Sequence, residues 1–484
     1  MIITRLSIVI VFALAVVLAL TTSVGGGSSK EVSQANASAK KAPKAQVAKA
    51  PVKSSSRGPN RSNRPNILLF ITDDQRLDTM DGMPKTQRIF SNGIKYTNAY
   101  VTTPVCCPSR ASIYSGQYAH NHGIVQNAGS GFGNPNNFFP RYLKQSGYRT
   151  AVFGKYLNGW EKTFGNTTSP PFIDNVFLGF DENGNTHPRK DPGDDFLAQK
   201  AISWIKDQER RNSAQPWMAI VAIHSPHWPL VAAPRFRNAV VPPRPALPSV
   251  NAVAYNKVPA LNNIRGFSEW GPVRPNWVRS MTYKMLQSAD VLVEKTSQAV
   301  PLNERNNTLS IFTSDNGFLW GDWGVQTKFY PYQQNIRVPM YVKYPKKVSP
   351  AVRDDLVANI DIAPTILKAA NITPTHTIDG QDMIDPSDPR QWLLVENLNP
   401  KQAINPPWLS YVDKYQQFIQ YYEDGYTAGS SLPTFWERYD IQSDPHSLTN
   451  LLPDGSQRPG NDTAAGWISA LLENTAQCQG EQCP

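Results

Sequence analysis

Short apolar runs that end abruptly in polar side chains constrain the fold of this 484-residue chain more than any other feature. From Pro65 onward these runs alternate with amphipathic ones, which predicts an α/β domain with a large mixed, mostly parallel sheet. Four runs end in chemically active residues: NILLFIT (66–72) before Asp73 and Asp74, TAVFG (150–154) before Lys155, WMAIVAI (217–223) before His224 and His227, and TLSIFTS (308–314) before Asp315 and Asn316. Ligands bind at the carboxyl ends of strands in such sheets, so we expect these side chains to share one edge.

The formal net charge of +10 is concentrated at the N-terminus. Residues 1–64 contain ten Lys or Arg residues and a single acidic one, Glu31. The remaining chain has 38 basic and 37 acidic residues and is nearly neutral. This distribution does not support binding of nucleic acid through a basic face, and we expect no nucleic-acid partner.

The chain is expected to have five parts. Arg5 followed by the apolar run 6–20 predicts a signal peptide or signal anchor, hence a secreted or extracytoplasmic protein that an uncleaved segment would tether to the envelope. The predicted parts are the signal segment 1–23, a disordered basic linker 24–64, the main α/β domain 65–370, a C-terminal subdomain 371–460 and a C-terminal helix or tail 461–484. In the subdomain, WLLVE (392–396), YQQFIQYYED (415–424) and FWERYDI (435–441) predict a smaller antiparallel sheet.

Two further segments have a distinct pattern. Residues 231–276 are rich in Pro, Asn and Arg and predict a long surface excursion that shapes substrate access. Cys478 and Cys483 lie five residues apart near the C-terminus, where a small disulfide loop and two free thiols are both compatible with the sequence.

Asp73, Asp74, Asp315 and Asn316 all offer oxygen ligands. Oxygen-only sets suit Ca²⁺, with Mg²⁺ as the alternative. Each of the two motifs by itself is also typical of an ordinary turn at a strand end. Their pairing after two buried strands favours a metal site.

In the stretch CCPSRAS (106–112), Pro, Ser and Arg come just before a run, 111–118, that predicts a helix. A helix N-terminus lowers the pKa of a thiol, and Arg110 would add a fixed positive charge. These features suggest a nucleophile, and an unmodified cysteine enzyme would use His120 or His122 as its base. A thiolate beside a hard cation is poorly matched chemistry, however, so a residue carrying oxygen would suit position 106 better.

The motif C-x-P-S-R followed by small residues resembles the signature of type I sulfatases. The resemblance covers about residues 65–455 and includes PNILLFITDDQ (65–75), GKYLN (154–158), SPHWPLVAAP (225–234), FTSDNG (312–317), TKFYPYQQNIRVPM (327–340) and ERYDIQSDPHSLTNLL (437–452). The segments CCPSRAS, HNH and GKYLN look most like the N-acetylglucosamine-6-sulfatase branch. The resemblance implies an alkaline-phosphatase-like fold, and it makes 65–370 the catalytic domain, with 371–460 completing the fold.

The same resemblance implies the roles of the site residues. A formylglycine-generating enzyme would convert Cys106 to formylglycine (3-oxoalanine), with Cys107 in the variable position. Asp73, Asp74, Asp315, Asn316 and the modified Cys106 would bind Ca²⁺. Arg110 would stabilise the formylglycine, Lys155 and Lys328 would contact sulfate oxygens, and His227 would lie at the leaving-group side. One hydroxyl of the aldehyde hydrate would attack sulfur and the second would release sulfate, which a serine cannot do.

One position departs from the common pattern. Leu157 stands where many sulfatases have a histidine that is proposed as the base for sulfate release, and Asn158 follows it. The base therefore stays open, with His122 and His224 as candidates, and Asn158 is a further possible site residue. A locally hydrogen-bonded helix-end histidine is the alternative for His122. Three tryptophans are candidates for contact with a sugar ring, with core packing as the alternative: Trp228, Trp320 and Trp323.

The sequence thus predicts a sulfuric ester hydrolase acting on a sulfated carbohydrate such as N-acetylglucosamine-6-sulfate. One alternative is a phosphonate or phosphate monoester hydrolase of the same superfamily. A second is a non-catalytic relative that binds sulfated glycans, although Cys106, Arg110, Lys155 and Lys328 are all present. A third is a cysteine hydrolase that uses unmodified Cys106.

Overall fold

The computed structural model describes residues 64–127, 134–159, 170, 172–177, 193–211, 215–243, 245–268, 271–399 and 405–484, all within the unit Arg57–Pro484. The predicted signal segment 1–23 and the predicted linker 24–64, except Arg64, lie outside these residues. In the described part of the chain, no helix combines the length and the apolar character needed to cross a membrane.

An eight-stranded sheet with the order β4-β3-β5-β1-β6-β7-β2-β8 organises the fold. Its strands are β1 (Asn66–Thr72), β2 (Ile94–Tyr100), β3 (Arg149–Gly154), β4 (Asn175–Phe177), β5 (Trp217–Ala222), β6 (Thr308–Ser314), β7 (Met340–Lys343) and β8 (Ala351–Ala358). Strands β4, β3, β5, β1 and β6 run parallel, and only β7 is antiparallel to its neighbours β6 and β2. The predicted mixed, mostly parallel sheet is therefore confirmed.

The central strand β1 is buried on both faces, as its continuous apolar sequence requires. Side chains alternate between the faces of a strand. Ile67, Leu69 and Ile71 accordingly enter one hydrophobic core, and Leu68 and Phe70 enter the core on the opposite face.

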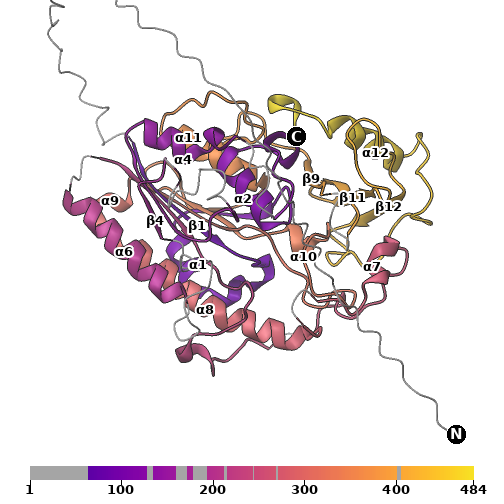
Figure 1. The fold of residues 1–484 in the computed structure, drawn as a ribbon, viewed down its shortest axis with the longest axis horizontal. Coiled ribbons are helices and arrows are strands. Elements are labelled where there is room, and N and C mark those ends of the chain that lie inside the picture. Colours follow the sequence, from indigo (N-terminus) through magenta and orange to yellow (C-terminus); the bar gives the residue numbers. More distant parts are fainter. Residues whose placement is uncertain are drawn as a thin grey trace, which may run out of the picture. The chain divides into compact units, whose positions relative to one another are not determined.

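Helices cover both faces of this sheet (Figure 1). On one side lie α2 (Cys106–Ser115), α4 (Phe139–Gln145) and α11 (Ile362–Ala369), and on the other lie α1 (Pro84–Phe90), α6 (Gly193–Arg211) and α8 (Pro275–Ala299). The shorter helices are α3 (Ala119–His122), α7 (Pro259–Asn263), α9 (Leu302–Arg305) and α10 (Gln333–Ile336), with 3₁₀ turns at Leu77–Gly82, Pro135–Asn137, Pro234–Phe236, Asn359–Asp361 and Gly480–Gln482.

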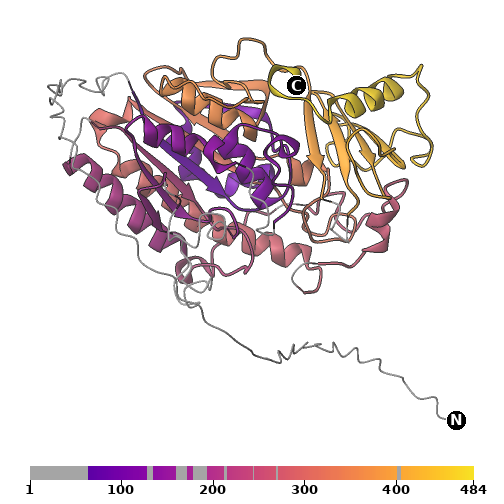
Figure 2. The same ribbon diagram turned by 45° about the horizontal axis from the view of Figure 1, so that its top comes forward.

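A second, four-stranded antiparallel sheet has the order β12-β11-β10-β9 (Figure 2). Its strands are β9 (Leu393–Asn397), β10 (Trp408–Val412), β11 (Gln416–Tyr421) and β12 (Phe435–Asp440), and α12 (Ala464–Thr475) packs against it. Three of these strands match the predicted runs, whereas β10 was not predicted. Cys478 and Cys483 form a disulfide, so the alternative of two free thiols is wrong for this structure.

Candidate active site

The acidic motifs meet because their strands are adjacent. Strands β1 and β6 pair in parallel with Thr72 opposite Ser314, so the residues that follow them leave the same edge of the sheet. The N–H of Asp315 donates to the carbonyl of Thr72 at 3.0 Å, and the N–H of Asp74 donates to Oδ1 of Asp315 at 3.2 Å. Asp74 has a φ of 65°, in the left-handed region that non-glycine residues seldom adopt. This turn brings the carboxylates of both motifs together.

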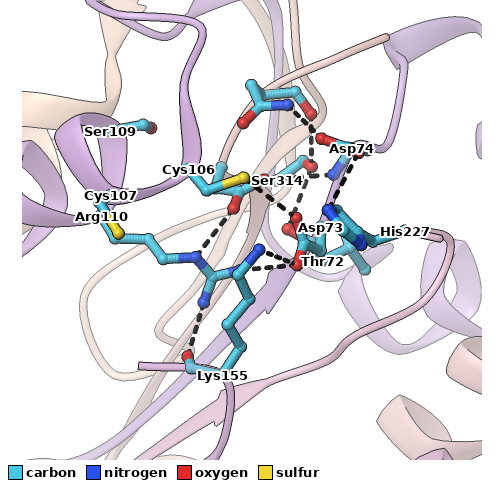
Figure 3. A network of polar contacts seen from close by, with 12 residues as sticks. Thr72, Asp73, Asp74, Cys106, Cys107, Ser109, Arg110, Lys155, His227 and Ser314 are labelled. Atoms are coloured by element: carbon cyan, nitrogen blue, oxygen red, sulfur yellow. Dashed lines mark hydrogen bonds and ion pairs between the residues drawn. The ribbon is translucent and has the colours of Figure 1, made fainter. Parts of the chain in front are cut away.

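Helix α2 brings the cysteine motif to this edge. The predicted helical run began at Ala111, but α2 begins at Cys106, with Pro108 in its first turn. Proline is tolerated there because the first N–H groups of a helix have no partner within the helix. Cys106 and Arg110 are four residues apart and therefore lie on one face of α2. Figure 3 shows both side chains directed at the acidic edge.

Arg110 is fully buried and connects three parts of the site. Its Nε donates to Oδ2 of Asp315 at 2.8 Å, and its Nη1 donates to the carbonyl of Lys155 at 2.7 Å. Its Nη2 lies 3.8 Å from Oδ2 of Asp73. The planar guanidinium can hold several acceptors in fixed directions, so Arg110 orients the acids and the lysine segment relative to α2.

Two lysines and a histidine complete the polar cluster. Nζ of Lys155 donates to Oδ2 of Asp73 at 2.6 Å. Nζ of Lys328 lies 2.9 Å from Oδ1 of Asp74 and 3.0 Å from Sγ of Cys106, which itself lies 3.6 Å from Oδ1 of Asp73. Nδ1 of His227 bonds the carbonyl of the next residue, Trp228, at 2.6 Å, so the other ring nitrogen faces Asp74 at 3.8 Å.

Burial and charge shift the ionisation of these groups in different directions. Burial raises the pKa of Asp315 to about 6, and the neighbouring Asp73 charge acts in the same direction. Burial would also raise the pKa of Asp73, but the charges of Lys155 and Arg110 hold it well below its ordinary value. Burial raises the pKa of the Cys106 thiol to about 12 despite the two lysines. The thiol is therefore protonated at neutral pH.

The residues present fit an oxygen-preferring cation. Asp73, Asp74, Cys106 and Asp315 are buried, and one ligand atom from each lies within 4.8 Å of the others. Within the described chain, the buried Oδ1 of Asn316 has no hydrogen-bond partner, although its Nδ2 donates to Oδ1 of Asp74 at 2.5 Å. Three buried carboxylates and an unpaired amide oxygen form the ligand set that Ca²⁺ or Mg²⁺ takes.

The candidates for the base have different surroundings. His122 lies on the other side of α2, where its Nε2 is 3.0 Å from Oγ of Ser112 and its Nδ1 accepts the N–H of Ile124. Burial lowers the pKa of His122 to about 3, so this histidine is a neutral, locally bonded residue outside the cluster. The ring of His224 lies 5.1 Å from that of His227 and is nearer the site. The side chain of Asn158 is exposed.

The three tryptophans also separate. Trp320 and Trp323 are buried, the first beneath the guanidinium of Arg76 and the second beside Tyr332. Both are packing residues, as the core alternative predicted. Trp228, next to His227, is only half-buried and stays a candidate for sugar contact.

Sequence reasoning missed a function of Cys107. It is buried, and its Sγ accepts the N–H of Asn158 at 3.1 Å, while its own N–H donates to Oδ1 of Asn127 at 2.9 Å. Cys107 is thus more than a spacer, because it holds the far end of the segment that carries Lys155. Arg110 holds the near end of the same segment. Because Cys107 and Arg110 are three residues apart on a helix, their side chains lie on neighbouring positions, and this spacing was the signal in the sequence.

Comparison with known proteins agrees with this architecture. A family model described as Sulfatase matches residues 65–372, and one described as N-sulphoglucosamine sulphohydrolase, C-terminal, matches residues 321–462. The chain is 30% identical to human N-acetylglucosamine-6-sulfatase over 365 residues, 67% of this chain and 64% of the relative. It is 27% identical to the goat N-acetylglucosamine-6-sulfatase over 491 residues, 87% of this chain and 85% of the relative.

Longer relatives match over only part of their length. The Extracellular sulfatase SULF-1 homolog of Drosophila melanogaster is 29% identical over 365 residues, which are 67% of this chain but 31% of the relative. A Caenorhabditis elegans homologue is likewise matched over 48% of its length. The chain thus spans about a third to a half of these two curated relatives.

Two solved structures share the fold at low sequence identity. A protein in complex with its substrate D-glucosamine-2-N,6-O-disulfate has a TM-score of 0.70 at 21% identity, covering 86% of this chain and 98% of that one. The phosphonate monoester hydrolase of Agrobacterium radiobacter has a TM-score of 0.70 at 18% identity, covering 86% and 96%. These likenesses show that the fold is of the alkaline-phosphatase-like class. Within that class the chain belongs to the sulfatase family, whose enzymes are sulfuric ester hydrolases.

Proposed function

We propose that this protein hydrolyses a sulfate monoester of a sulfated sugar such as N-acetylglucosamine-6-sulfate, with formylglycine at position 106 and Ca²⁺ at the acidic edge. The observation that carries the proposal is the placement of Cys106. Its Sγ stands where an oxygen of formylglycine would lie, 3.6 Å from Oδ1 of Asp73 and 3.0 Å from Nζ of Lys328. A nucleophile at that point faces both the candidate metal ligands and a cation suited to sulfate.

Asp73, Asp74, Asp315, Asn316 and the modified Cys106 would hold the ion. The aldehyde hydrate of formylglycine supplies one hydroxyl for attack on sulfur and another for release of sulfate, and Ca²⁺ makes the hydrate more acidic. Lys155 and Lys328 provide positive charge for the sulfuryl oxygens as negative charge develops on them. His227 or Lys328 protonates the departing alcohol. Arg110 keeps α2, Asp315 and the Lys155 segment in register for these contacts.

The alternatives are less well supported by the site. A cysteine hydrolase needs a thiolate, but burial raises the pKa of Cys106 to about 12. A non-catalytic glycan-binding protein would have no need for a modifiable cysteine between two lysines and three carboxylates. The phosphonate or phosphate monoester hydrolase is the second candidate, because the phosphonate hydrolase shares the fold with the same TM-score of 0.70.

Two measurements test the proposal. Mass spectrometry of the peptide around Cys106 should show a loss of about 18 Da, which corresponds to conversion of the thiol to an aldehyde. The Cys106→Ser variant should fold normally and lose turnover of an aryl sulfate. A fully active protein with an unmodified thiol would contradict the mechanism. Faster release of phosphate than of sulfate from matched aryl esters would favour the phosphate alternative.

The same proposal includes the location and maturation of the chain. Two of the relatives are named extracellular sulfatases, and the Cys478–Cys483 disulfide is typical of oxidising compartments. We therefore propose an extracytoplasmic protein that meets a formylglycine-generating enzyme during export. The signal segment 1–23, the linker 24–64 and the boundaries 65–370, 371–460 and 461–484 stay predictions.

A further inference from the structure

The positive charge of residues 65–484 is concentrated on one segment, 231–279, which we call the basic excursion. It contains seven Arg or Lys residues and one acidic residue, Glu269. The rest of residues 65–484 contains 31 basic and 36 acidic residues. The excursion thus carries a net charge of +6, whereas the remainder carries −5. A local excess of one charge sign attracts ligands of the opposite sign.

The two ends of the basic excursion lie near the candidate active site. It begins four residues after His227 and ends in the first two turns of α8. The rings of Trp228 and Trp277 approach to 6.4 Å between centroids. Asp74 and Trp228 line one small cavity together with residues of α8. The excursion and the acidic edge are therefore continuous.

Arg274 connects the excursion to the segment that carries Lys328. Its backbone N–H donates to Oε1 of Gln326 at 3.3 Å, and Gln326 stands two residues before Lys328. A bridge between Ser268 and Gln326 fixes the same segment from the other side. The first turn of α8 thus lies beside the residues expected to hold sulfate.

The fold itself uses four of the excursion's cations. Arg235 pairs with Asp195, Lys257 is buried beside Tyr439, Arg265 donates to the carbonyls of Asn251, Ala252 and Trp323, and Arg279 donates to the carbonyl of Pro242. Arg237 and Arg274 are exposed, and among the described residues neither has a carboxylate partner. Trp277, between Arg274 and Arg279 in sequence, is 42% exposed. Two cations and an aromatic ring of the excursion are therefore exposed, and Arg274 and Trp277 are the two that contacts connect to the site.

We propose that Arg237, Arg274 and Trp277 form a subsite for a multiply sulfated polysaccharide chain. This subsite binds the sulfated residues that extend beyond the ester held at the active site. Guanidinium groups match the oxygens of sulfate as they match other oxyanions, and an exposed indole offers a flat apolar face to a sugar ring. The inference rests on the proposed function, and it makes the preferred substrate a polymer with many sulfate groups rather than a small ester.

Charge complementarity and position select this ligand over other polyanions. A surface continuous with a sulfate-ester site receives the neighbouring sulfates of the same chain whenever one ester occupies the site. Binding at two linked sites raises the effective affinity of a chain without changing the chemistry at either site. Substrate length is therefore the property that the subsite should detect.

The first test compares substrates of different length in the wild type and the Arg237→Gln/Arg274→Gln variant. For a heparin-derived oligosaccharide, we expect kcat/KM of the variant to fall about tenfold, mainly through KM, as charges at a rim act on encounter. For 4-nitrophenyl sulfate we expect a change below about twofold, because neither arginine belongs to the catalytic cluster. Equal losses on both substrates, or no loss on the oligosaccharide, would overturn the inference.

Arg210→Gln/Arg211→Gln is the matched control. Both arginines lie at the end of α6, just before β5 begins, and therefore at the amino ends of the parallel strands, opposite the acidic edge. This control also removes two charges but does not touch the subsite, so we expect unchanged kinetics. A loss equal to that of Arg237→Gln/Arg274→Gln would show a general charge effect and would overturn the inference. Trp277→Ala should reproduce the selective loss on the oligosaccharide.

A binding measurement separates this inference from the proposed function. Calorimetry with the Cys106→Ser variant and heparin measures the subsite without turnover, with desulfated heparin as the comparison. We expect heparin affinity to fall about tenfold at about 0.5 M salt and in the Arg237→Gln/Arg274→Gln variant, because ionic contacts are screened. Equal affinity for desulfated heparin would overturn the subsite. Selective heparin binding without sulfatase activity would instead reject the proposed function alone.

Discussion

The buried lysines of the active site and the buried Lys257 have opposite electrostatic settings. In the active site, burial disfavours the charge of Lys155, but the carboxylate of Asp73 at 2.6 Å raises its pKa above the ordinary value. Lys257 instead lies within 4.7 Å of the ring centroids of three aromatic residues, Trp323, Tyr332 and Tyr439. Burial lowers the pKa of Lys257 to about 8, although the charge of Glu437 acts in the other direction.

The difference shows how the surroundings of a buried lysine decide its function. Lys257 donates to the hydroxyl of Tyr439 at 2.5 Å and to the carbonyl of Ser447 at 2.6 Å, and its nearest carboxylate, Glu437, is 3.9 Å away. These contacts join the basic excursion to β12. They are formed within the protein, and neither a metal ion nor a substrate takes the place of any of these partners. Lys155 and Lys328 share a cluster of three carboxylates with Arg110, where a cation and a sulfate can replace ion pairs.

The largest expected effect separates the two settings by activity. Lys328→Ala should lower kcat for an aryl sulfate about a thousandfold, because a positive charge that faces the developing negative charge is lost. The variant also loses a buried ion pair with Asp74, so its free energy of unfolding should fall as well. Steady-state kinetics and urea unfolding on the same preparation measure both quantities. Lys257→Met, assayed where it is folded, should keep most of its kcat. A comparable loss of kcat in both variants would remove the distinction.

Lys257→Met should lower stability while it keeps most of kcat. Removal of one partner from a buried ion pair leaves Glu437 without its cation and costs about 3 kcal/mol of unfolding free energy. Urea unfolding followed by tryptophan fluorescence measures this loss. The matched variant Lys346→Met, at an exposed position, should change stability by less than about 0.5 kcal/mol. Unchanged stability of Lys257→Met would show that the aromatic cluster does not need the charge.

Calcium should act on one region only. If the acidic edge binds Ca²⁺, free ion at a hundredfold excess over its Kd should raise the unfolding free energy by about 2.7 kcal/mol. The Asp315→Asn variant should lose most of this stabilisation, whereas Lys257→Met should retain it. Thermal unfolding at a series of free Ca²⁺ concentrations gives the measurement. A Ca²⁺ response that survives in Asp315→Asn would place the ion elsewhere.

The pH dependence of stability should report Lys257. Its pKa is about 8 in the folded protein and 10.5 ordinarily, so between these values the unfolded chain holds a proton that the folded chain has lost. The contribution of Lys257 to the free energy of unfolding therefore rises with pH across this interval. By pH ~9.5 it is about 2 kcal/mol higher than at a pH below both values. The difference in unfolding free energy between the wild type and Lys257→Met should therefore grow as the pH increases, because the variant lacks the group that gains this stability. A constant difference would contradict the lowered pKa.

The smallest effect concerns the segment that carries Lys155. Cys107→Ser keeps an acceptor for the N–H of Asn158 and should change kcat/KM by less than about twofold. Cys107→Val removes this acceptor and should lower kcat/KM by an amount equivalent to about 1 kcal/mol. Kinetics with an aryl sulfate compare the two variants. If valine is tolerated as well as serine, Arg110 alone positions the segment.

Much of this architecture follows from local patterns. The apolar runs at 66–72 and 308–314 predicted buried strands that end in acids, and the structure pairs them as neighbours. Strand β10 was not predicted, because its isolated five residues are interpretable only beside β9 and β11. The predicted helical run began at Ala111, whereas α2 begins at Cys106, because the first helical turn accepts Pro108.

The sequence by itself determined which residue types stand at the ends of strands, because burial requires continuous apolar runs and the chain must leave the core through polar residues. The sequence also contains the cysteine motif at 106–112, which by itself indicated the resemblance to type I sulfatases. Only the tertiary structure decided that Cys107 bonds Asn158, that Trp320 and Trp323 are buried, and that Lys257 differs from Lys155. Those outcomes depend on distances between residues far apart in the chain. Local sequence carries no direct measure of such distances, whereas electrostatic and hydrogen-bond energies depend on them directly.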